Sequence, residues 1–480
     1  MSPQPLPRLA ALALASALAG CASVAPDGLR GDVQALAQPR IGLTGVADAA
    51  LPAADPVARE QARQAIAGWL AQPLTQEAAM RTALLNHPGL QARLAALGVA
   101  DAERVQTLTL PNPQFSIARL TNSHEREIER SLAFSLLDLV TLSWRSARQA
   151  EQLQVATVQA AQEVVAHAAD TRRAWLRAVA AEQVAAAHER MVEAAEAGAE
   201  LARRMARVGN FSRLQQAREQ AVLQEANAQR ARARLAATTA REQLARSMGL
   251  WGPQVQQFTL PTQLPALPAT ALPADGIEAT ALRERLDVQA ASRQLDTATR
   301  QQGWARAGAV FGDIGIAYQR NTATEQDSGH RETTRGWELD VPLPLFDWGG
   351  AARTRAQLRV EQSAATLQDT AVRARSEVRS AWLTYRTALD LARQQRDEVV
   401  PLRQLITDET TLRYNGMLAS VWELLAEARA STQSVAGAIE AQRDFWLAET
   451  DLQLALTGTS PGALQGLAAS SATPSTPAGH

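Results

Sequence analysis

The sequence predicts an α+β membrane protein built from a duplicated unit, in which a helix, a β-hairpin, a long helix and a returning helix follow one another. Three observations predict this fold class. Sequence segments recur at an offset of about 200 residues, each half has two stretches of about ten residues with alternating apolar side chains, and each half has a run of about 65 residues with helical composition. Alternation is typical of strands, and runs of that length are typical of helices that pack side by side.

The composition excludes several classes of protein. The 480 residues include 48 basic and 49 acidic side chains, a formal net charge of −1, so the chain lacks the cationic excess of a nucleic-acid-binding protein. No lysine occurs, which excludes enzymes that depend on a P-loop lysine or a Schiff-base lysine. Alanine is abundant and aromatic residues make up only 4%, a composition that favours helices.

The N-terminus has the features of an export signal. Arg8 precedes an apolar run over residues 9–19, which is too short to span a bilayer as a helix, and Leu18-Ala19-Gly20 leads into Cys21. This pattern resembles the bacterial lipoprotein signal, so residues 1–20 are expected to be removed and Cys21 to receive lipid (palmitate). Cys21 is the only cysteine, which excludes a disulfide within the chain. No other window holds 18 consecutive apolar residues, so no further membrane-spanning helix is expected.

The repeat divides the chain into segments. Ala83-Leu84-Leu85 corresponds to Ala281-Leu282-Arg283 at an offset of 198, and Leu132 corresponds to Leu339 at an offset of 207. The offset grows within a polar stretch, where a duplication tolerates insertion. The predicted segments are the signal peptide (1–20), a lipid anchor with an extended arm (21–73), the first repeat (74–250), a Pro-rich linker (251–276), the second repeat (277–458) and a disordered tail (459–480).

Each repeat is expected to contain the same elements. The expected helices span 74–109, 142–208 and 212–249 in the first repeat, and 277–306, 350–414 (interrupted at Pro401) and 419–457 in the second. The alternating apolar residues that predict the two hairpins are Phe115, Ile117, Leu120, Leu132, Phe134 and Leu136, and then Ile314, Ile316, Tyr318, Trp337, Leu339, Val341 and Leu343. Trp337 is expected at the edge of a lipid-facing band, although such alternation also occurs in a soluble hairpin.

The strands predict an oligomer. Strands of about ten residues match the length that crosses a bilayer at a tilt, but four strands cannot close a barrel, and open sheet edges are not tolerated in lipid. Three chains would supply twelve strands, an even number within the bacterial range. The expected assembly is a trimer with a twelve-stranded β-barrel, continued by a helical barrel whose helices reach roughly 100 Å.

Two motifs, together with the duplication, resemble a known family. Pro342-Leu343-Pro344-Leu345-Phe346-Asp347-Trp348-Gly349 follows the second hairpin, and Arg413-Tyr414-Asn415-Gly416-Met417-Leu418-Ala419-Ser420 forms the second helical turn. Residues 74–458 are similar to the TolC family of outer-membrane efflux proteins, lipoprotein branch. The resemblance implies a homotrimer in the Gram-negative outer membrane, with a helical tunnel in the periplasm. It also implies two partners, a periplasmic adaptor (membrane fusion) protein and an inner-membrane pump of the RND or ABC type.

The resemblance implies that the two helical turns dock on the adaptor. Val208-Gly209 is expected to correspond to Asn415-Gly416 at an offset of 207. The family often has its turn glycine one residue later than Gly416. The candidate docking residues are Val208, Gly209, Asn210, Asn415, Gly416 and Met417.

The residues beside the second turn are candidates for a periplasmic gate. They are Glu423, Arg413 and Tyr414, together with Gln215, the first-repeat counterpart of Glu423. If Glu423 faced a threefold axis, three carboxylates would meet and attract cations. The family usually has aspartate at this place, and the alternative is that Glu423 is an ordinary solvated helix residue.

No enzyme is expected. The six histidines include no pair at the i,i+4 spacing of a helical metal site, and they are interpreted as independent surface or boundary residues. His-Glu-x-x-His and Gly-rich phosphate motifs do not occur. The sequence therefore predicts neither a catalytic site nor a metal or other cofactor.

The leading functional hypothesis is a passive exit duct in a tripartite efflux or type I secretion-like system. The alternative is a non-conducting lipoprotein scaffold that spaces the outer membrane from the cell wall. Such a scaffold has no need of lipid-length alternating strands or of a polar lumen. The transported substrate is left open between a metal ion, a drug and other compounds. The sequence Asn415-Gly416-Met417-Leu418 resembles members encoded with metal-resistance systems.

Overall fold

The computed structural model describes residues 23–42, 51, 56–109, 112–308, 314–325, 328–341 and 348–462. The predicted signal peptide, Cys21, the motif residues Pro342–Asp347 and most of the predicted tail lie outside the described residues. The elements are α2 (Arg30–Ile41), α3 (Pro56–Leu70), α4 (Gln76–Asn86), α5 (Pro88–Leu108), β1 (Gln114–Thr121), β2 (Glu125–Ser135), α6 (Leu136–Arg207), α7 (Arg213–Ser247), α8 (Gln254–Gln257), α9 (Ile277–Glu284), α10 (Leu286–Gly308), β3 (Gly315–Glu325), β4 (Arg331–Asp340), α11 (Gly350–Gln394), the π-helical turn η1 (Gln395–Val399), α12 (Val400–Asn415), α13 (Val421–Gln453) and the π-helical turn η2 (Leu454–Gly458).

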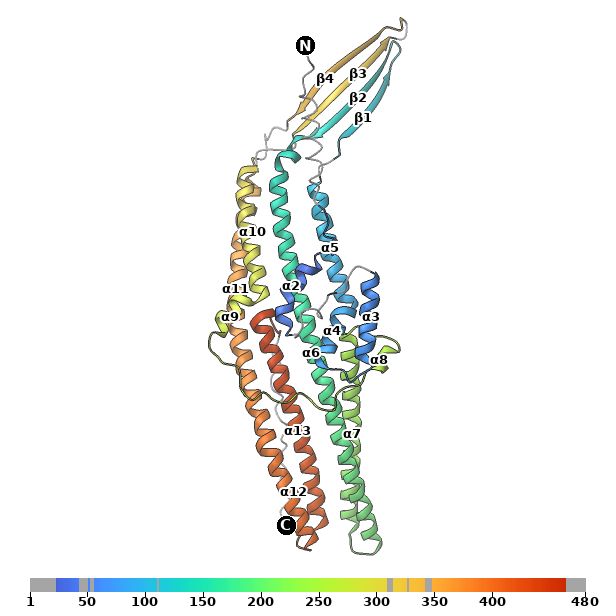
Figure 1. Cartoon of the computed structure of the whole chain (residues 1–480), viewed down its shortest axis with the longest axis vertical. Helices are drawn as coiled ribbons and strands as arrows, with labels where there is room; N and C mark the ends of the chain where they lie inside the picture. Colours follow the sequence, from blue (N-terminus) through green and yellow to red (C-terminus); the bar gives the residue numbers. More distant parts are fainter. Residues whose placement is uncertain are drawn as a thin grey trace. The chain divides into compact units, whose positions relative to one another are not determined.

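The described residues are mostly helical with one small antiparallel sheet, and the order of elements repeats (Figure 1). In each half, a pair of helices precedes a hairpin, a long helical stretch follows it, and a shorter helix returns. Helix α6 is 72 residues long and its partner α7 is 35. Among the described helices, none combines the length and the apolar character needed to cross a membrane.

The first helix of each repeat is broken, which the sequence analysis did not predict. Helix α4 ends where His87 becomes extended (ψ 117°) before Pro88, because a residue that precedes proline disfavours the helical region. Helix α9 ends at the equivalent residue, Arg285 (ψ 130°), although no proline follows. Both residues still donate their backbone N–H to the carbonyl four residues back.

The predicted extended arm is partly helical. Helices α2 and α3 lie within residues 21–73, and their inward residues Val33, Ile66 and Leu70 are buried. Both segments are too short to be stable as isolated helices, so burial stabilises them.

The chain divides into two compact units that cut across the predicted repeats. One unit comprises residues 1–29, 94–159 and 289–370, and the other comprises residues 30–93, 160–288 and 371–480. Each unit therefore contains segments of both repeats.

The first unit contains the sheet, whose strands follow the order β1-β2-β3-β4, all antiparallel. Strands β2 and β3 come from different repeats and pair over eleven residues, from Glu125–Glu325 to Ser135–Gly315. The period-2 prediction placed the strands correctly but extended them too far. Leu136 begins α6, and Ile314 and Val341 lie just outside β3 and β4.

The long helical stretch of the second repeat continues through Pro401. Proline lacks an N–H and its ring collides with the carbonyl four residues before it, which here belongs to Asp397. The π-helical turn η1 contains Asp397, and the backbone resumes α-helical geometry at Val400. A π-helical turn widens the backbone at that point, so proline is accommodated without ending the helix.

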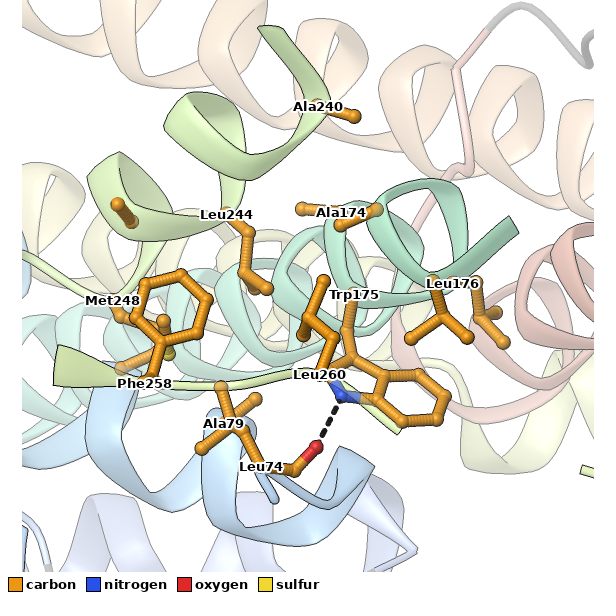
Figure 2. Close-up of a cluster of buried hydrophobic side chains, with 14 of the residues drawn as sticks. Leu74, Ala79, Ala174, Trp175, Leu176, Ala240, Leu244, Met248, Phe258 and Leu260 are labelled. Atoms are coloured by element: carbon orange, nitrogen blue, oxygen red, sulfur yellow. Dashed lines mark hydrogen bonds between the residues drawn. The ribbon is translucent and has the colours of Figure 1, made fainter. Parts of the chain in front are cut away.

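The second unit has an alanine-rich core. Figure 2 shows part of it: Trp175 of α6 lies among Ala79, Leu244, Phe258 and Leu260. The indole N–H of Trp175 donates to the carbonyl of Leu74 at 2.8 Å. Small alanine side chains let the helices approach closely, and the few aromatic residues fill the remaining volume.

The Pro-rich linker is fixed to the second unit by hydrogen bonds along its length. Side chains of α6, α11 and α13 donate hydrogen bonds to carbonyl groups of the linker. Proline residues lack a backbone N–H but keep the carbonyl, so these acceptors remain available in a Pro-rich segment. These bonds are Gln183 Nε2 to Thr262 O (2.8 Å), Trp446 Nε1 to Pro265 O (2.9 Å) and Arg393 Nη2 to Pro268 O (2.9 Å). In addition, the backbone N–H of Leu74 donates to Thr259 O (2.8 Å), and the linker's own Leu272 N donates to Tyr385 Oη (3.1 Å). The linker is thus an ordered strap.

Candidate functional site

One face of the sheet is apolar at the end near the helices. Side chains alternate between the faces of a strand, so residues paired across the sheet share a face. The register aligns Phe115, Leu132, Tyr318 and Trp337 in one row, and Phe134, Ile316 and Leu339 in the row before it. Trp337 is 73% exposed and Leu339 is 64% exposed, so these apolar groups have no partner within the described chain that covers them. Leu120, in contrast, lies on the opposite face from Phe115 and Ile117.

The opposite face carries the acidic side chains. It has no aromatic residue, and small or polar residues such as Ser116, Ser131 and Gln319 occupy the rows between the acids. The carboxylates of this face are Glu125, Glu127, Glu129, Glu325, Glu332, Glu338 and Asp340. The sheet therefore separates an apolar surface from a hydrophilic, anionic one.

The two helical turns have the same hydrogen bonds, but at an offset of 208. Asn210 N donates to Met205 O (3.0 Å), and Leu418 N donates to Arg413 O (2.7 Å). The residue before each donor has a left-handed backbone: Gly209 has φ 80° and Met417 has φ 62°. The structure thus corrects the expected correspondence of Gly209 with Gly416, whose φ is −81°. Met417 takes the conformation that usually selects glycine at a helix C-terminus.

The gate candidates Gln215 and Glu423 are both helix-capping residues. In α7 the hydroxyl of Ser212 accepts from Gln215 N (3.2 Å), and Gln215 Oε1 accepts from Ser212 N (2.9 Å). In α13 Ser420 and Glu423 make the same two bonds, at 3.2 and 2.8 Å. The spacing Ser-x-x-Gln/Glu predicts such a capping box, a signal that the sequence analysis missed.

The other turn residues are exposed and support the turn through their backbones. The carbonyls of Arg413 and Tyr414 accept from Leu418 N and Met417 N. The side chains of Val208 and Met417 are 71% and 94% exposed. Exposed apolar side chains at a turn offer contact area to a partner. Val208 provides such a side chain in the first repeat, and Met417 provides one in the second.

The two helix pairs meet beside these turns. The rings of Phe211 and Trp422 stack with centroids 4.6 Å apart, and Arg429 forms an ion pair with Glu219 at 3.4 Å. The sequence analysis identified none of these four residues. The local sequence around each residue does not indicate a contact with a residue about 200 positions away.

Two histidines predicted to be independent lie in contact. The rings of His87 and His167 are 4.3 Å apart, and the Nε2 atom of His167 is buried without a hydrogen-bond partner. Burial, together with the nearby His87, lowers the pKa of His167 from 6.5 to about 4. Among the described residues, no group of three or more His, Cys, Asp or Glu side chains is placed to hold a metal ion.

The equivalent place in the second repeat holds a buried cation instead. Arg285 has no exposed surface, and it pairs with Asp287 at 2.6 Å and Glu377 at 2.9 Å. Its Nη1 also reaches the carbonyl of Ala455, at 3.5 Å, near the end of the returning helix. In the first repeat Asn86 Nδ2 donates to the carbonyls of Met248 and Gly249 at the end of α7. Each break between paired helices thus stabilises the C-terminus of the returning helix.

No protein-family model matches the chain, and no curated protein matches its sequence. Several solved structures do resemble it. A membrane protein from Pseudomonas aeruginosa has a TM-score of 0.67 at 18% identity, covering 81% of this chain and 95% of its own. The Campylobacter jejuni CmeC outer membrane channel scores 0.65 at 14% identity (84% and 87% covered), and the open Neisseria gonorrhoeae MtrE outer membrane channel scores 0.62 at 18% (81% and 90%).

The chain has the TolC-family fold. The resemblance inferred from the sequence is therefore confirmed at the level of fold. The hairpins and the helical turns are the features that the two repeats of this chain share. Gly416 precedes the left-handed position of the second turn, which is occupied by Met417.

Proposed function

We propose that this protein is a passive outer-membrane channel and not an enzyme, the exit duct of a tripartite efflux or type I secretion-like system. The observation that supports this function most directly is the four-stranded sheet, with one apolar face, one carboxylate-rich face and two unpaired edges. The similar solved structures described as outer membrane channels support the same function.

The sheet edges support a trimer. Strands β1 and β4 each pair on one side only within the described chain. Unpaired backbone groups cost several kcal/mol each in hydrocarbon, so a membrane-inserted sheet must close. Three chains close it as a twelve-stranded barrel, in which β4 of one chain pairs with β1 of the next, and the long helices continue as a helical barrel in the periplasm.

The two faces of the sheet support an orientation in that barrel. The rows of Phe115 and Phe134 face lipid, and the carboxylate face lines the lumen. A non-conducting scaffold has no use for such a lumen, so the division of the faces favours the channel over the scaffold.

We also propose that Cys21 carries lipid at the outer membrane. Ala22 follows Cys21, in place of the aspartate that often retains lipoproteins at the inner membrane. Mass spectrometry of the mature protein is expected to find residues 1–20 missing and an acylated Cys21. A mature chain with an unmodified Cys21 would contradict this proposal.

The helical turns are proposed to dock on the periplasmic adaptor, which links them to the inner-membrane pump. The exposed Val208, Asn210, Asn415 and Met417 suit such contacts, with Gly209 as the left-handed residue of the first turn and Gly416 next to Met417 in the second. The double variant Val208→Ser/Met417→Ser should weaken co-purification of a co-expressed periplasmic adaptor, while Leu235→Ser, which changes an exposed apolar residue of α7, should not.

Two measurements test the channel itself. Native mass spectrometry of detergent-extracted protein is expected to give three chains, and planar-bilayer recordings are expected to give stepwise conductance. A membrane-inserted monomer would contradict the trimer. A trimer without conductance would favour the scaffold.

A further inference from the structure

The apolar face of the sheet becomes cationic toward the hairpin ends. Beyond the row of Tyr318 and Trp337, the next three rows of the same face carry arginines. They are Arg130, Arg320 and Arg335 in the first of these rows, Arg119 in the second, and Arg126 and Arg331 in the third.

Three of these arginines are direct neighbours. Arg130 pairs in register with Arg320, which pairs with Arg335, so three guanidinium groups follow one another across strands about 5 Å apart. Like charges directly opposite each other destabilise a sheet. Such a row is stable when anions lie between its members.

The described residues supply no such anion. In the part of the chain that the structure describes, none of the six arginines forms an ion pair, and the carboxylates of the strands lie on the other face. An anion between these arginines would therefore come from outside the described part of the chain.

The aromatic residues indicate the depth of the arginine rows in the membrane. The rings of Tyr318 and Trp337 pack edge to face at 5.2 Å, one row before the arginine row. Tyr and Trp concentrate where hydrocarbon meets lipid headgroups. The arginines begin one row further toward the hairpin ends, about 7 Å away, which is the depth of the headgroups.

We propose that these arginine rows bind the phosphate groups of anionic lipid headgroups in the outer leaflet of the membrane. Guanidinium groups bind phosphate through two parallel hydrogen bonds, and three in a row provide several such sites. The inference rests on the proposed function, because it requires the apolar face to lie against lipid.

The test is binding of diphosphorylated lipid A to the purified trimer, counted by native mass spectrometry. Wild-type protein should retain lipid A, and the variant Arg130→Gln/Arg320→Gln/Arg335→Gln should bind it roughly a hundredfold more weakly. A matched control, Arg218→Gln/Arg232→Gln/Arg246→Gln, removes three exposed arginines of α7 and should bind as wild type does. Equal lipid binding by the sheet variant and wild type would overturn the proposal.

A second comparison needs no substitution. Wild-type trimer should bind dephosphorylated lipid A far more weakly than the diphosphorylated form, and millimolar inorganic phosphate should not displace the latter. Equal binding of the two lipids, or displacement by inorganic phosphate alone, would contradict a lipid headgroup site. Conductance recorded from the same wild-type preparation tests the proposed channel separately, so a conducting trimer without phosphate-dependent lipid binding would reject only the lipid site.

Discussion

Met417 occupies a backbone conformation that costs an L-residue about 1–2 kcal/mol relative to the right-handed region. Glycine, as at Gly209, adopts it freely. The Met417 side chain is 94% exposed, so little packing is lost with it. We expect Met417→Gly to raise the free energy of unfolding by about 1 kcal/mol, measured by thermal unfolding followed by circular dichroism.

The two glycines provide the controls for this substitution. Gly209→Ala should destabilise the protein because φ is 80° there. Gly416→Ala should have little effect, because φ is −81° and the nearest atom to an added Cβ is the Leu412 carbonyl oxygen at 3.5 Å. A larger loss at Gly416 than at Gly209 would contradict the correspondence of the turns at an offset of 208.

His167 should make stability depend on pH. Its pKa is about 4 in the folded protein, because burial disfavours the charged form, and about 6.5 when unfolded. Above pH 6.5 both states are neutral. Between pH 6.5 and 4 the unfolded chain takes up a proton that the folded chain does not, so up to roughly 3 kcal/mol of stability is lost as the pH falls through this window.

The measurement is the change in Tm between pH 7 and pH 4.5. His167→Gln should reduce that change, while His330→Gln, in an exposed hairpin connection, should leave it as it is. An unaltered pH dependence in His167→Gln would show that other groups account for it.

At the scale of residues, the sequence predicted positions better than roles. Ser420 and Glu423 were identifiable as a capping box from spacing alone, whereas the burial of His167 depends on packing against His87, 80 residues away in the chain. The left-handed backbone of Met417 could not be predicted, because glycine lies next to it and is the usual choice.

At the scale of elements, the break between α9 and α10 depends on Arg285. Its guanidinium is buried against Asp287 and Glu377, so removal of the cation leaves two carboxylates unpaired. Loss of one partner of a buried ion pair typically costs about 3–5 kcal/mol. We expect Arg285→Met to lower Tm strongly, whereas Arg283→Gln, which removes a mostly exposed pair with Glu284, should change stability by less than about 1 kcal/mol. Similar Tm values for both variants would contradict a structural role for the buried cluster.

The elements predicted from periodicity were those with long or strict patterns. Helices α6 and α7 and the four strands lie close to their expected ranges, because many residues contribute to each pattern. The break at Arg285 has no proline or glycine beside it and arises from burial of one side chain, which local sequence does not encode. Helices α2 and α3 were missed for the related reason that tertiary packing stabilises them.

At the scale of the whole molecule, Glu423 offers a clean test of the proposed gate. Glu423→Gln keeps the capping box, because Gln215 makes the same two bonds in the first repeat. The substitution therefore removes charge without removing the cap. If three Glu423 side chains meet at the axis, the variant should show lower cation selectivity and weaker block by divalent cations in planar-bilayer recordings. Unchanged selectivity would restrict Glu423 to its capping role, and attention would turn to Arg413 and Tyr414.

The duplication and the fold were predictable because each rests on hundreds of residues. The alignment of the two helical turns could not be predicted from the sequence. A difference of one residue in the repeat offset changes which amino acid takes the left-handed backbone conformation. The row of arginines across β2, β3 and β4 likewise depends on the register between strands from different repeats, which no local pattern specifies.

The pairing of β2 with β3 has a consequence for how the molecule can be assembled. This ladder, and not only the covalent linker, joins one repeat to the other, and the strap is bound to the helices through its carbonyls. A chain interrupted at the exposed Asp275–Gly276 bond should therefore function by fragment complementation, with two co-expressed halves that co-purify and conduct. Halves that fail to associate, while the intact chain folds, would show that covalent continuity is required to bring the two hairpins together.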